Sequence, residues 1–241
     1  MASMQNNGFE AALLVDFHAH VLPRADHGSD SLSTSLFQLS AARDAGVKRV
    51  VATPHFYPAR HTVEYFLERR SSAYDALAPH ISDGYPELIL GAEVLICPGI
   101  DHMEGIEKLC IGDTRTILIE LPFSEFESSY CDVAYKLSSN GMSVVLAHAD
   151  RYPKENIERM VSAGAKIQLN ASSLATLFRR KHLYSWLSRG LVVALGSDIH
   201  GRDSGAYKAY IKALARTEPY LLDIMNSSNE LLRAYEKIKA E

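Results

Sequence analysis

Residues 11–20 read AALLVDFHAH, and this stretch decides the fold because a short apolar run ends directly in histidines. Near the other end of the chain, residues 192–200 read VVALGSDIH, so a second apolar run ends in Asp198 and His200. Short aliphatic runs are typical of strands that are buried on both faces. Imidazole and carboxylate groups are metal ligands, so the sequence predicts a metal centre assembled from strand ends, and therefore an enzyme.

Apolar runs alternate with helical stretches along the whole chain. The seven expected strands are 12–17, 49–53, 87–91, 116–121, 143–147, 166–170 and 192–196. The expected helices are 32–45, 63–77, 131–139, 153–164 and 172–188, with further helices over 203–239. This alternation implies parallel strands. Seven parallel strands fit either an open sheet or a barrel related to the eight-stranded kind, in which functional groups lie at the C-terminal strand ends.

Side chains of metal-ligand type stand at or just after the end of most expected strands. They are His18, His20, His55, Glu93, Glu120, His148, Asp198 and His200. A single histidine in such a place is usually a surface or hydrogen-bonded residue. Five histidines and three carboxylates at one edge would be unfavourable without shared cations, because carboxylates repel and burial removes their hydration. The set therefore predicts a polynuclear metal site.

The spacing of the ligands supports this interpretation. His18 and His20 are two residues apart, so in an extended segment their side chains point the same way and can bind one ion. Asp198 and His200 have the same spacing. Imidazole combined with carboxylate suits zinc, iron or manganese better than calcium. His27 lies in the loop after the first strand, from where it can reach the same mouth.

Composition limits the function classes. The chain has 241 residues and a formal net charge of −4, which argues against generic nucleic-acid binding. No apolar run approaches the length of a membrane span, and no basic residue precedes the first strand as in a signal peptide. Three cysteines without a CxxC pair indicate reduced thiols rather than a disulfide framework. We therefore expect a cytoplasmic protein without a membrane span.

Eight short motifs together resemble the polymerase-and-histidinol-phosphatase (PHP) superfamily of metal-dependent phosphoesterases. The motifs are DFHAH at 16–20, ADHG at 25–28, ATPH at 52–55, GAE at 91–93, IELP at 119–122, AHADRY at 147–152, QLN at 168–170 and GSDIH at 196–200. The resemblance is strongest to the bacterial PHP-type tyrosine-protein phosphatases of capsular and exopolysaccharide systems. A lone HxH motif is weak, but this ordered series is specific.

The resemblance runs from Asp16 to about residues 226–229, and we expect a single PHP domain over residues 9–241. Residues 1–8 are polar, so we expect a disordered N-terminus there. The resemblance implies an α/β fold, a distorted seven-stranded (β/α)7 TIM-like barrel with three divalent metal ions, manganese first and iron or zinc as alternatives. Carried over by position, the first ion takes His18, His20, Glu93 and Asp198, the second takes Glu93, Glu120 and His148, and the third takes His55, His200 and His27.

Two arginines are candidates for phosphate binding. Arg151 matches an arginine that the resembled phosphatases use for this purpose. A second arginine of the family follows the last histidine by several residues, whereas here Arg202 comes two residues after His200. This departure concerns substrate choice more than chemistry. Asp16 and Asn170 are candidates for orienting the metal ligands through hydrogen bonds.

The expected reaction is hydrolysis of a phosphate monoester by a metal-activated hydroxide, with Arg151 stabilising the equatorial oxygens. The resemblance implies a phosphotyrosine protein as substrate, such as the tail of a bacterial capsule or exopolysaccharide tyrosine kinase. Asp26 and His27 are candidates for a general acid. The alternatives are a phosphatase for histidinol phosphate or another small phosphomonoester, an amidohydrolase, and a non-catalytic metal-binding module. No oligomeric state is predicted.

Overall fold

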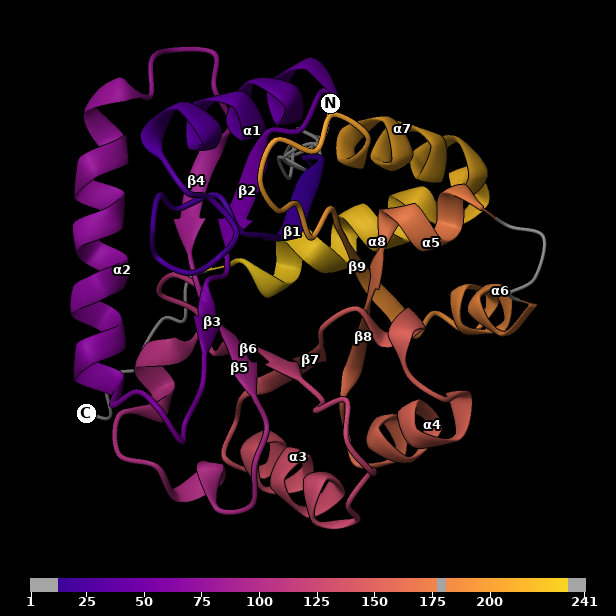
Figure 1. The fold of residues 1–241 in the computed structure, drawn as a ribbon. Helices are drawn as coiled ribbons and strands as arrows, with labels where there is room; N and C mark the ends of the chain where they lie inside the picture. The colour runs from indigo at the N-terminus through magenta and orange to yellow at the C-terminus, as the bar shows by residue number, and fades with distance from the viewer. Residues whose placement is uncertain (1–12, 177–180, 234–241) are drawn as a thin grey trace, which may run out of the picture.

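The computed structural model describes residues 13–176 and 181–233, and within them nine strands form the centre of an α/β fold (Figure 1). One sheet has the order β1-β2-β4 and the other has the order β3-β5-β6-β7-β8-β9, with every neighbouring pair parallel. The strands are β1 (Val15–Ala19), β2 (Arg49–Ala52), β3 (His55–Phe56), β4 (Glu87–Leu90), β5 (Glu93–Leu95), β6 (Thr116–Glu120), β7 (Ser143–Leu146), β8 (Lys166–Asn170) and β9 (Val192–Gly196).

Seven expected strands become nine because two of them are each followed, after a two-residue break, by a further short strand. Residues 53–54 separate β2 from β3, and residues 91–92 separate β4 from β5. Pro54 has no N–H to donate to a sheet, which favours a break there. Its carbonyl still accepts a hydrogen bond from the Glu93 N–H at 3.1 Å, so the two broken strands stay paired through the break. Each of the seven predicted stretches therefore overlaps a strand of the structure, and β3 and β5 are two additional short strands that were not predicted.

Hydrogen bonds between the first and last strands close the two sheets into a barrel. The Asp198 N–H donates to the His18 carbonyl at 2.8 Å, and the His20 N–H donates to the Ile199 carbonyl at 3.3 Å. Gly196 permits this approach, because a Cβ there would lie 2.6 Å from the His18 Cβ. The barrel prediction is thus confirmed over the open sheet, and the two clusters from opposite ends of the sequence lie side by side.

Helices cover the outside of the barrel (Figure 1). They are α1 (Leu32–Asp44), α2 (Val63–Leu77), α3 (Ser129–Ser139), α4 (Lys154–Ser162), α5 (Ala171–Ala175), α6 (Lys181–Ser188), α7 (Ala206–Arg216) and α8 (Glu218–Leu231), with 3₁₀ turns η1 (Ala78–His80), η2 (Ile100–His102), η3 (Ile106–Leu109) and η4 (Ala149–Arg151). The side chains of Ser31 and Thr62 cap α1 and α2 by accepting backbone N–H groups of the first turn. None of the helices within the described residues is both long and apolar enough to span a membrane.

The end of α8 lies against the N-terminal ends of the strands, opposite the predicted metal centre. The Asn229 side chain donates to the Leu13 carbonyl at 2.7 Å, and the Thr116 hydroxyl donates to the Leu231 carbonyl at 2.7 Å. Leu231 also packs in one apolar cluster with strand residues such as Phe17 and Leu118. Helix α8 therefore closes the floor of the barrel.

Some element boundaries differ from the expectations. A single helix over 172–188 is wrong, because α5 ends at Ala175 and Thr176 leaves the helical region with φ −121° and ψ 54°. Strand β1 runs to Ala19, so His18 lies inside the strand rather than after it. Pro219 stands in the first turn of α8 as expected. The predicted N-terminal disorder at 1–8 and the helical stretch at 234–239 lie outside the described residues.

Replacing Tyr210 by Phe is expected to lower the free energy of unfolding by about 1–3 kcal/mol, because it leaves a buried carbonyl without its donor. Tyr210 on α7 is fully buried, and its hydroxyl donates to the Val15 carbonyl of β1 at 2.6 Å. Urea denaturation of the variant measures the change. Tyr135→Phe on α3 is the matched control, since that side chain is 64% exposed. Equal stability of both variants would contradict this account of the β1 anchor.

Candidate metal centre

The end of β1 and the turn after β9 bring three ligand-type groups together. The Nε2 atoms of His18 and His20 lie 3.1 Å apart, as expected for residues two apart in an extended segment. Asp198 Oδ1 lies 3.7 Å from His18 Nε2 and 3.4 Å from His20 Nε2. The barrel closure described above therefore places ligands from both ends of the chain within reach of one ion.

Glu93, the first residue of β5, lies at the centre of the cluster with its side chain fully buried. Its Oε2 lies 3.3 Å from His18 Nε2, 3.2 Å from His20 Nε2 and 2.9 Å from His55 Nδ1. Its other oxygen, Oε1, lies 2.7 Å from His148 Nε2. One carboxylate thus faces four imidazoles that come from three different strand ends, with His18 and His20 both at the end of β1.

Eight of the nine predicted ligands lie in four overlapping groups, in each of which one ligand atom per residue lies within 4.8 Å of the others. The groups are His20, His55 and His200; His18, His20 and Asp198; His18, Glu93 and His148; and His55, Glu93 and Glu120. The sharing of His18, His20, His55 and Glu93 between groups is what a polynuclear site requires.

The ninth predicted ligand, His27, lies at the exposed rim of the cluster. Its ring stacks on the His55 ring with centroids 4.9 Å apart and planes 9° apart, and its centroid lies 4.8 Å from that of His200. It is absent from the four groups found among the described residues. Metal binding by His27 therefore stays a prediction.

Several buried atoms of the cluster lack hydrogen-bond partners, as metal ligands would. Among the described residues, Glu93 Oε2, His55 Nδ1 and His148 Nδ1 are buried and accept or donate no hydrogen bond. The contacts of Glu93 Oε2 at 2.9–3.3 Å do not have hydrogen-bond geometry. Lone pairs that converge in this way are unfavourable without a cation. Imidazole and carboxylate donors suit zinc, iron or manganese, so these residues fit divalent metal ions.

The electrostatics of the cluster favour positive charge at its centre. Burial opposes protonation of His20, but the neighbouring carboxylates of Asp198, Asp26 and Glu93 outweigh it and raise the pKa of His20 well above its usual value. Burial likewise opposes protonation of His148, yet Glu120 and Glu93 raise its pKa to about 9.

The outer histidine behaves differently. Burial and the positive charge of His20 lower the pKa of His200 to about 4. Near neutral pH His200 is thus a neutral imidazole, which is the form that binds metals.

Two predicted supporting residues make hydrogen bonds that hold the ligand strands in place. The Asp16 carboxylate accepts the Ser197 N–H at 2.8 Å and the Tyr207 hydroxyl at 2.7 Å, which links β1 to the turn after β9 and to α7. Asn170 Nδ2 donates to Asp198 Oδ2 at 3.0 Å. Both residues thus orient ligands from outside the centre, as expected.

Two further supporting residues were missed as such from the sequence. Gln168 Oε1 accepts the His148 N–H at 2.6 Å and lies 3.2 Å from His18 Nδ1. Its position two residues before Asn170 on β8 was the available signal, because such residues share a strand face. Asp26, considered only as an acid, lies with Oδ2 2.6 Å from His20 Nδ1 and accepts the His55 N–H at 3.1 Å.

Backbone conformation also marks two of the ligands. His148 has φ 31° and Asp198 has φ 51°, values that residues other than glycine rarely adopt. Each follows a strand at the mouth of the barrel, where the chain turns sharply before η4 or the loop to α7. Such strain persists where surrounding contacts impose it, and it is often found at functional sites.

The two candidate arginines lie in different surroundings. Arg151 ends η4, and its Nη2 donates to Asp198 Oδ2, so its guanidinium lies directly against the centre. Arg202 instead donates to the Ser33 hydroxyl at 2.9 Å and lies over the Phe37 ring of α1 at 5.7 Å. The structure thus places Arg151 at the cluster and Arg202 against α1.

Comparison with known proteins finds bacterial tyrosine-protein phosphatases among the relatives of this chain. The tyrosine-protein phosphatase YwqE of Bacillus subtilis is 29% identical over 176 residues, covering 70% of this chain and 68% of the relative. The tyrosine-protein phosphatase CpsB of Streptococcus pneumoniae is 26% identical over 216 residues, covering 79% of this chain and 84% of the relative.

Similarity extends to a crystal structure and to a family model. The crystal structure comes from a study of YwqE from Bacillus subtilis and CpsB from Streptococcus pneumoniae, described as unique metal-dependent tyrosine phosphatases. It matches this chain with a TM-score of 0.76 and 24% identity, over 92% of this chain and 96% of that chain. At this identity the match confirms the fold. The family model for capsular polysaccharide synthesis proteins of the CpsB/CapC type matches residues 14–216, most of the chain. The chain therefore belongs to the CpsB/CapC family of capsular polysaccharide synthesis.

Proposed function

We propose that this protein is a metal-dependent phosphomonoester hydrolase that acts on phosphotyrosine in proteins. The observation that carries the proposal is the buried Glu93 carboxylate facing four imidazoles, with the Arg151 guanidinium at the edge of the same cluster. Metal ligands beside a group that binds phosphate are what phosphoryl transfer requires. The names of the YwqE and CpsB relatives support phosphotyrosine as the substrate.

We assign the ligands to three divalent ions, with manganese first and iron or zinc as alternatives. The assignment gives one ion to His18, His20, Glu93 and Asp198, a second to Glu93, Glu120 and His148, and a third to His55, His200 and His27. The four geometric groups support this scheme except at the third ion, where His20 stands closer to His55 and His200 than His27 does.

When bound, the ions would act as Lewis acids and would lower the pKa of a water molecule toward neutrality. Glu93 and Asp198 hold the ligands of β1 in one orientation through the contacts described above. Arg151 has five N–H donors, so it can keep its bond to Asp198 and also donate to the phosphoryl oxygens, where negative charge is spread during transfer.

The departing phenolate needs little help from an acid, because the pKa of tyrosine is about 10. Asp26 is a poor candidate for that acid. Burial opposes its ionisation, but the hydrogen bond with His20 and the charge of this histidine hold the pKa of Asp26 well below its usual value. The ionised carboxylate therefore orients His20 and the backbone at His55 rather than donating a proton.

We place the substrate phosphotyrosine on the tail of a bacterial tyrosine kinase of capsule or exopolysaccharide systems. Membership of the CpsB/CapC family of capsular polysaccharide synthesis supports this assignment. The free thiols of Cys97, Cys110 and Cys131 fit a cytoplasmic location, where disulfides are rare. We further propose that residues 9–241 act as one catalytic domain.

Metal-loaded protein is expected to hydrolyse a phosphotyrosyl peptide faster than histidinol phosphate, measured side by side as kcat/KM from phosphate release. Removal of metal with EDTA is expected to abolish both activities, and added Mn²⁺ is expected to restore them. Faster hydrolysis of histidinol phosphate would shift the substrate class to small phosphomonoesters. Full activity after metal removal would exclude the proposed mechanism.

His148→Ala is expected to lower kcat/KM for an aryl phosphate on the order of 100-fold or more. Loss of a residue that only supports a metal ligand typically costs about 10- to 100-fold in activity, and loss of the ligand itself is expected to cost more. Bound metal, measured by atomic emission, is expected to fall in the same variant. His80→Ala is the matched control, since His80 is exposed at the end of η1. Wild-type metal content and activity in His148→Ala would contradict the ligand assignment.

Arg151→Ala is expected to lower kcat/KM by about 100-fold, a typical cost of removing one donor to a transition-state oxygen. Its metal content is expected to stay unchanged. Arg202→Ala is expected to cost less, because Arg202 contacts α1. Loss of metal together with activity in Arg151→Ala would instead make Arg151 a structural partner of Asp198, and a larger loss in Arg202→Ala would reverse the two roles.

A further inference from the structure

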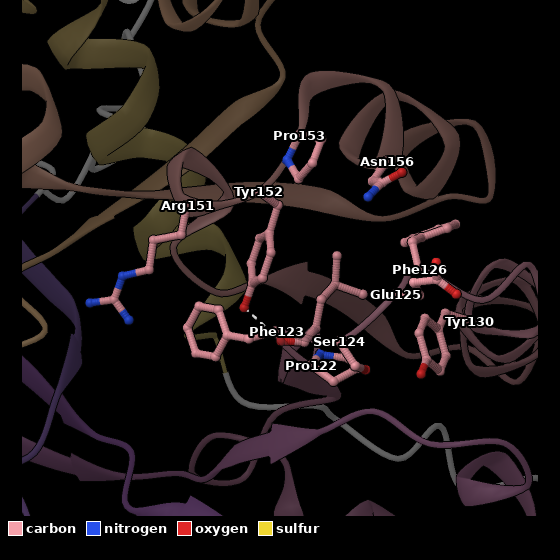
Figure 2. Close-up of a pocket in the computed structure, with 11 residues that line it drawn as sticks. Pro122, Phe123, Ser124, Glu125, Phe126, Tyr130, Arg151, Tyr152, Pro153 and Asn156 are labelled. Carbon is pink, nitrogen blue, oxygen red and sulfur yellow. Dashed lines mark hydrogen bonds between the residues drawn. The ribbon is translucent and has the colours of Figure 1, made fainter.

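A cavity of about 270 Å³ opens beside the metal centre (Figure 2). Its wall is formed by the loop after β6, residues 121–126, by Tyr130 of α3, by residues 151–153 at and after the end of η4, and by Asn156 of α4. The apolar part of the wall comes from Pro122, Phe123, Phe126, Tyr152 and Pro153. This cavity has no part in the ligand set described above.

Two residues that line the cavity, Arg151 and Tyr152, also contact residues of the metal centre. Arg151 lines the cavity and also donates to Asp198 of the centre. Tyr152 lies between the two sites, with its ring centroid 5.7 Å from that of His148 and 5.9 Å from that of Phe123. A molecule that holds a phosphate at the centre therefore has the mouth of this cavity next to it.

Phe123 is unusually exposed for a residue in this position. Its side chain is 75% exposed, although large apolar groups are normally packed. Figure 2 shows its ring between the guanidinium of Arg151 and the rest of the cavity wall. The hydroxyl of the neighbouring Tyr152 donates to the Leu121 carbonyl at 2.7 Å, which fixes the ring against which Phe123 lies. An exposed aromatic face on a fixed support is suited to stacking.

Charged side chains of opposite sign line the cavity. The cation of Arg151 lies toward the metal centre, whereas the carboxylate of Glu125 lines the other part of the cavity. An anionic phosphate is thus attracted to the Arg151 side, and the uncharged part of its ester is left to the aromatic side. This polarity matches an aryl phosphate, in which a dianion is joined directly to an apolar ring.

We propose that Phe123 and the adjoining cavity bind the aromatic ring of the substrate phosphotyrosine while its phosphate lies at the metal centre. The inference rests on the proposed function and adds the groups that select an aryl ester over an alkyl ester. Phe123 then acts by stacking, and Tyr152 acts as a positioning residue for Phe123. Neither residue moves a proton or binds metal in this role.

The test compares two non-hydrolysable probes, phenylphosphonate and methylphosphonate, binding to metal-loaded protein by isothermal titration calorimetry. Phe123→Ala is expected to weaken phenylphosphonate binding by about 3- to 10-fold, the range typical of one aromatic pair. Methylphosphonate binding is expected to stay unchanged. Phe123→Tyr, which keeps the ring, is expected to restore phenylphosphonate binding, and Tyr135→Ala, which removes an exposed aromatic residue on α3, is the matched control.

The outcomes separate this inference from the proposed function. Unchanged phenylphosphonate binding in Phe123→Ala, or an equal loss for both probes, would overturn the aryl subsite and leave the phosphatase assignment standing. A wild-type protein that binds neither probe when loaded with metal would contradict a phosphoryl site at the centre, and the subsite would fall with it. In a hydrolysis assay, Phe123→Ala is expected to have a lower kcat/KM for phenyl phosphate and an unchanged kcat/KM for an alkyl phosphate.

Discussion

Burial of the Glu93 carboxylate is the constraint on which the rest of the structure depends, because a buried charge is tolerated only when opposite charge surrounds it closely. Burial opposes its ionisation, yet the neighbouring histidines hold the pKa of Glu93 well below its usual value. The compensating groups cannot come from one segment, since a strand places only alternate residues on one face. They come instead from β1, from β3 and from the turn after β7. The barrel is the scaffold that brings these separate segments to one point.

The same requirement explains the irregular features of the barrel. The break at Pro54 and the break before Glu93 lie directly before His55 and Glu93, so two groups of the centre begin new short strands instead of continuing old ones. The left-handed backbone at His148 and Asp198 turns two more ligands into the mouth. Regular strand pairing is thus interrupted at the end of the barrel that carries the candidate metal centre. At the opposite end, α8 is hydrogen-bonded to the strands.

Much of this arrangement was predictable from the sequence because it depends on local pattern. The apolar runs and the ligand-type residues at their ends, such as His18, Glu93 and Asp198, can be found from periodicity alone, and the alternation of strands and helices then brings the ends together. The position of Arg202 could not be predicted, because it depends on packing between distant elements. Arg202 stands near His200 in the sequence, but Ser33 and Phe37 of α1 hold its side chain. Gln168 was missed because its partners, the His148 N–H and the His18 ring, belong to other strands.

The closure of β1 against β9 and the floor made by α8 have a consequence for synthesis of the chain. A domain generally folds as a unit, and during synthesis its N-terminal part is made before its C-terminal part. His18, His20 and Glu93 are translated before Asp198, which follows β9, and before the end of α8 at Leu231. A nascent chain therefore lacks part of the candidate ligand set until β9 and the turn after it have been translated. The geometry of the candidate centre is therefore a property of the closed barrel and not of its N-terminal half alone.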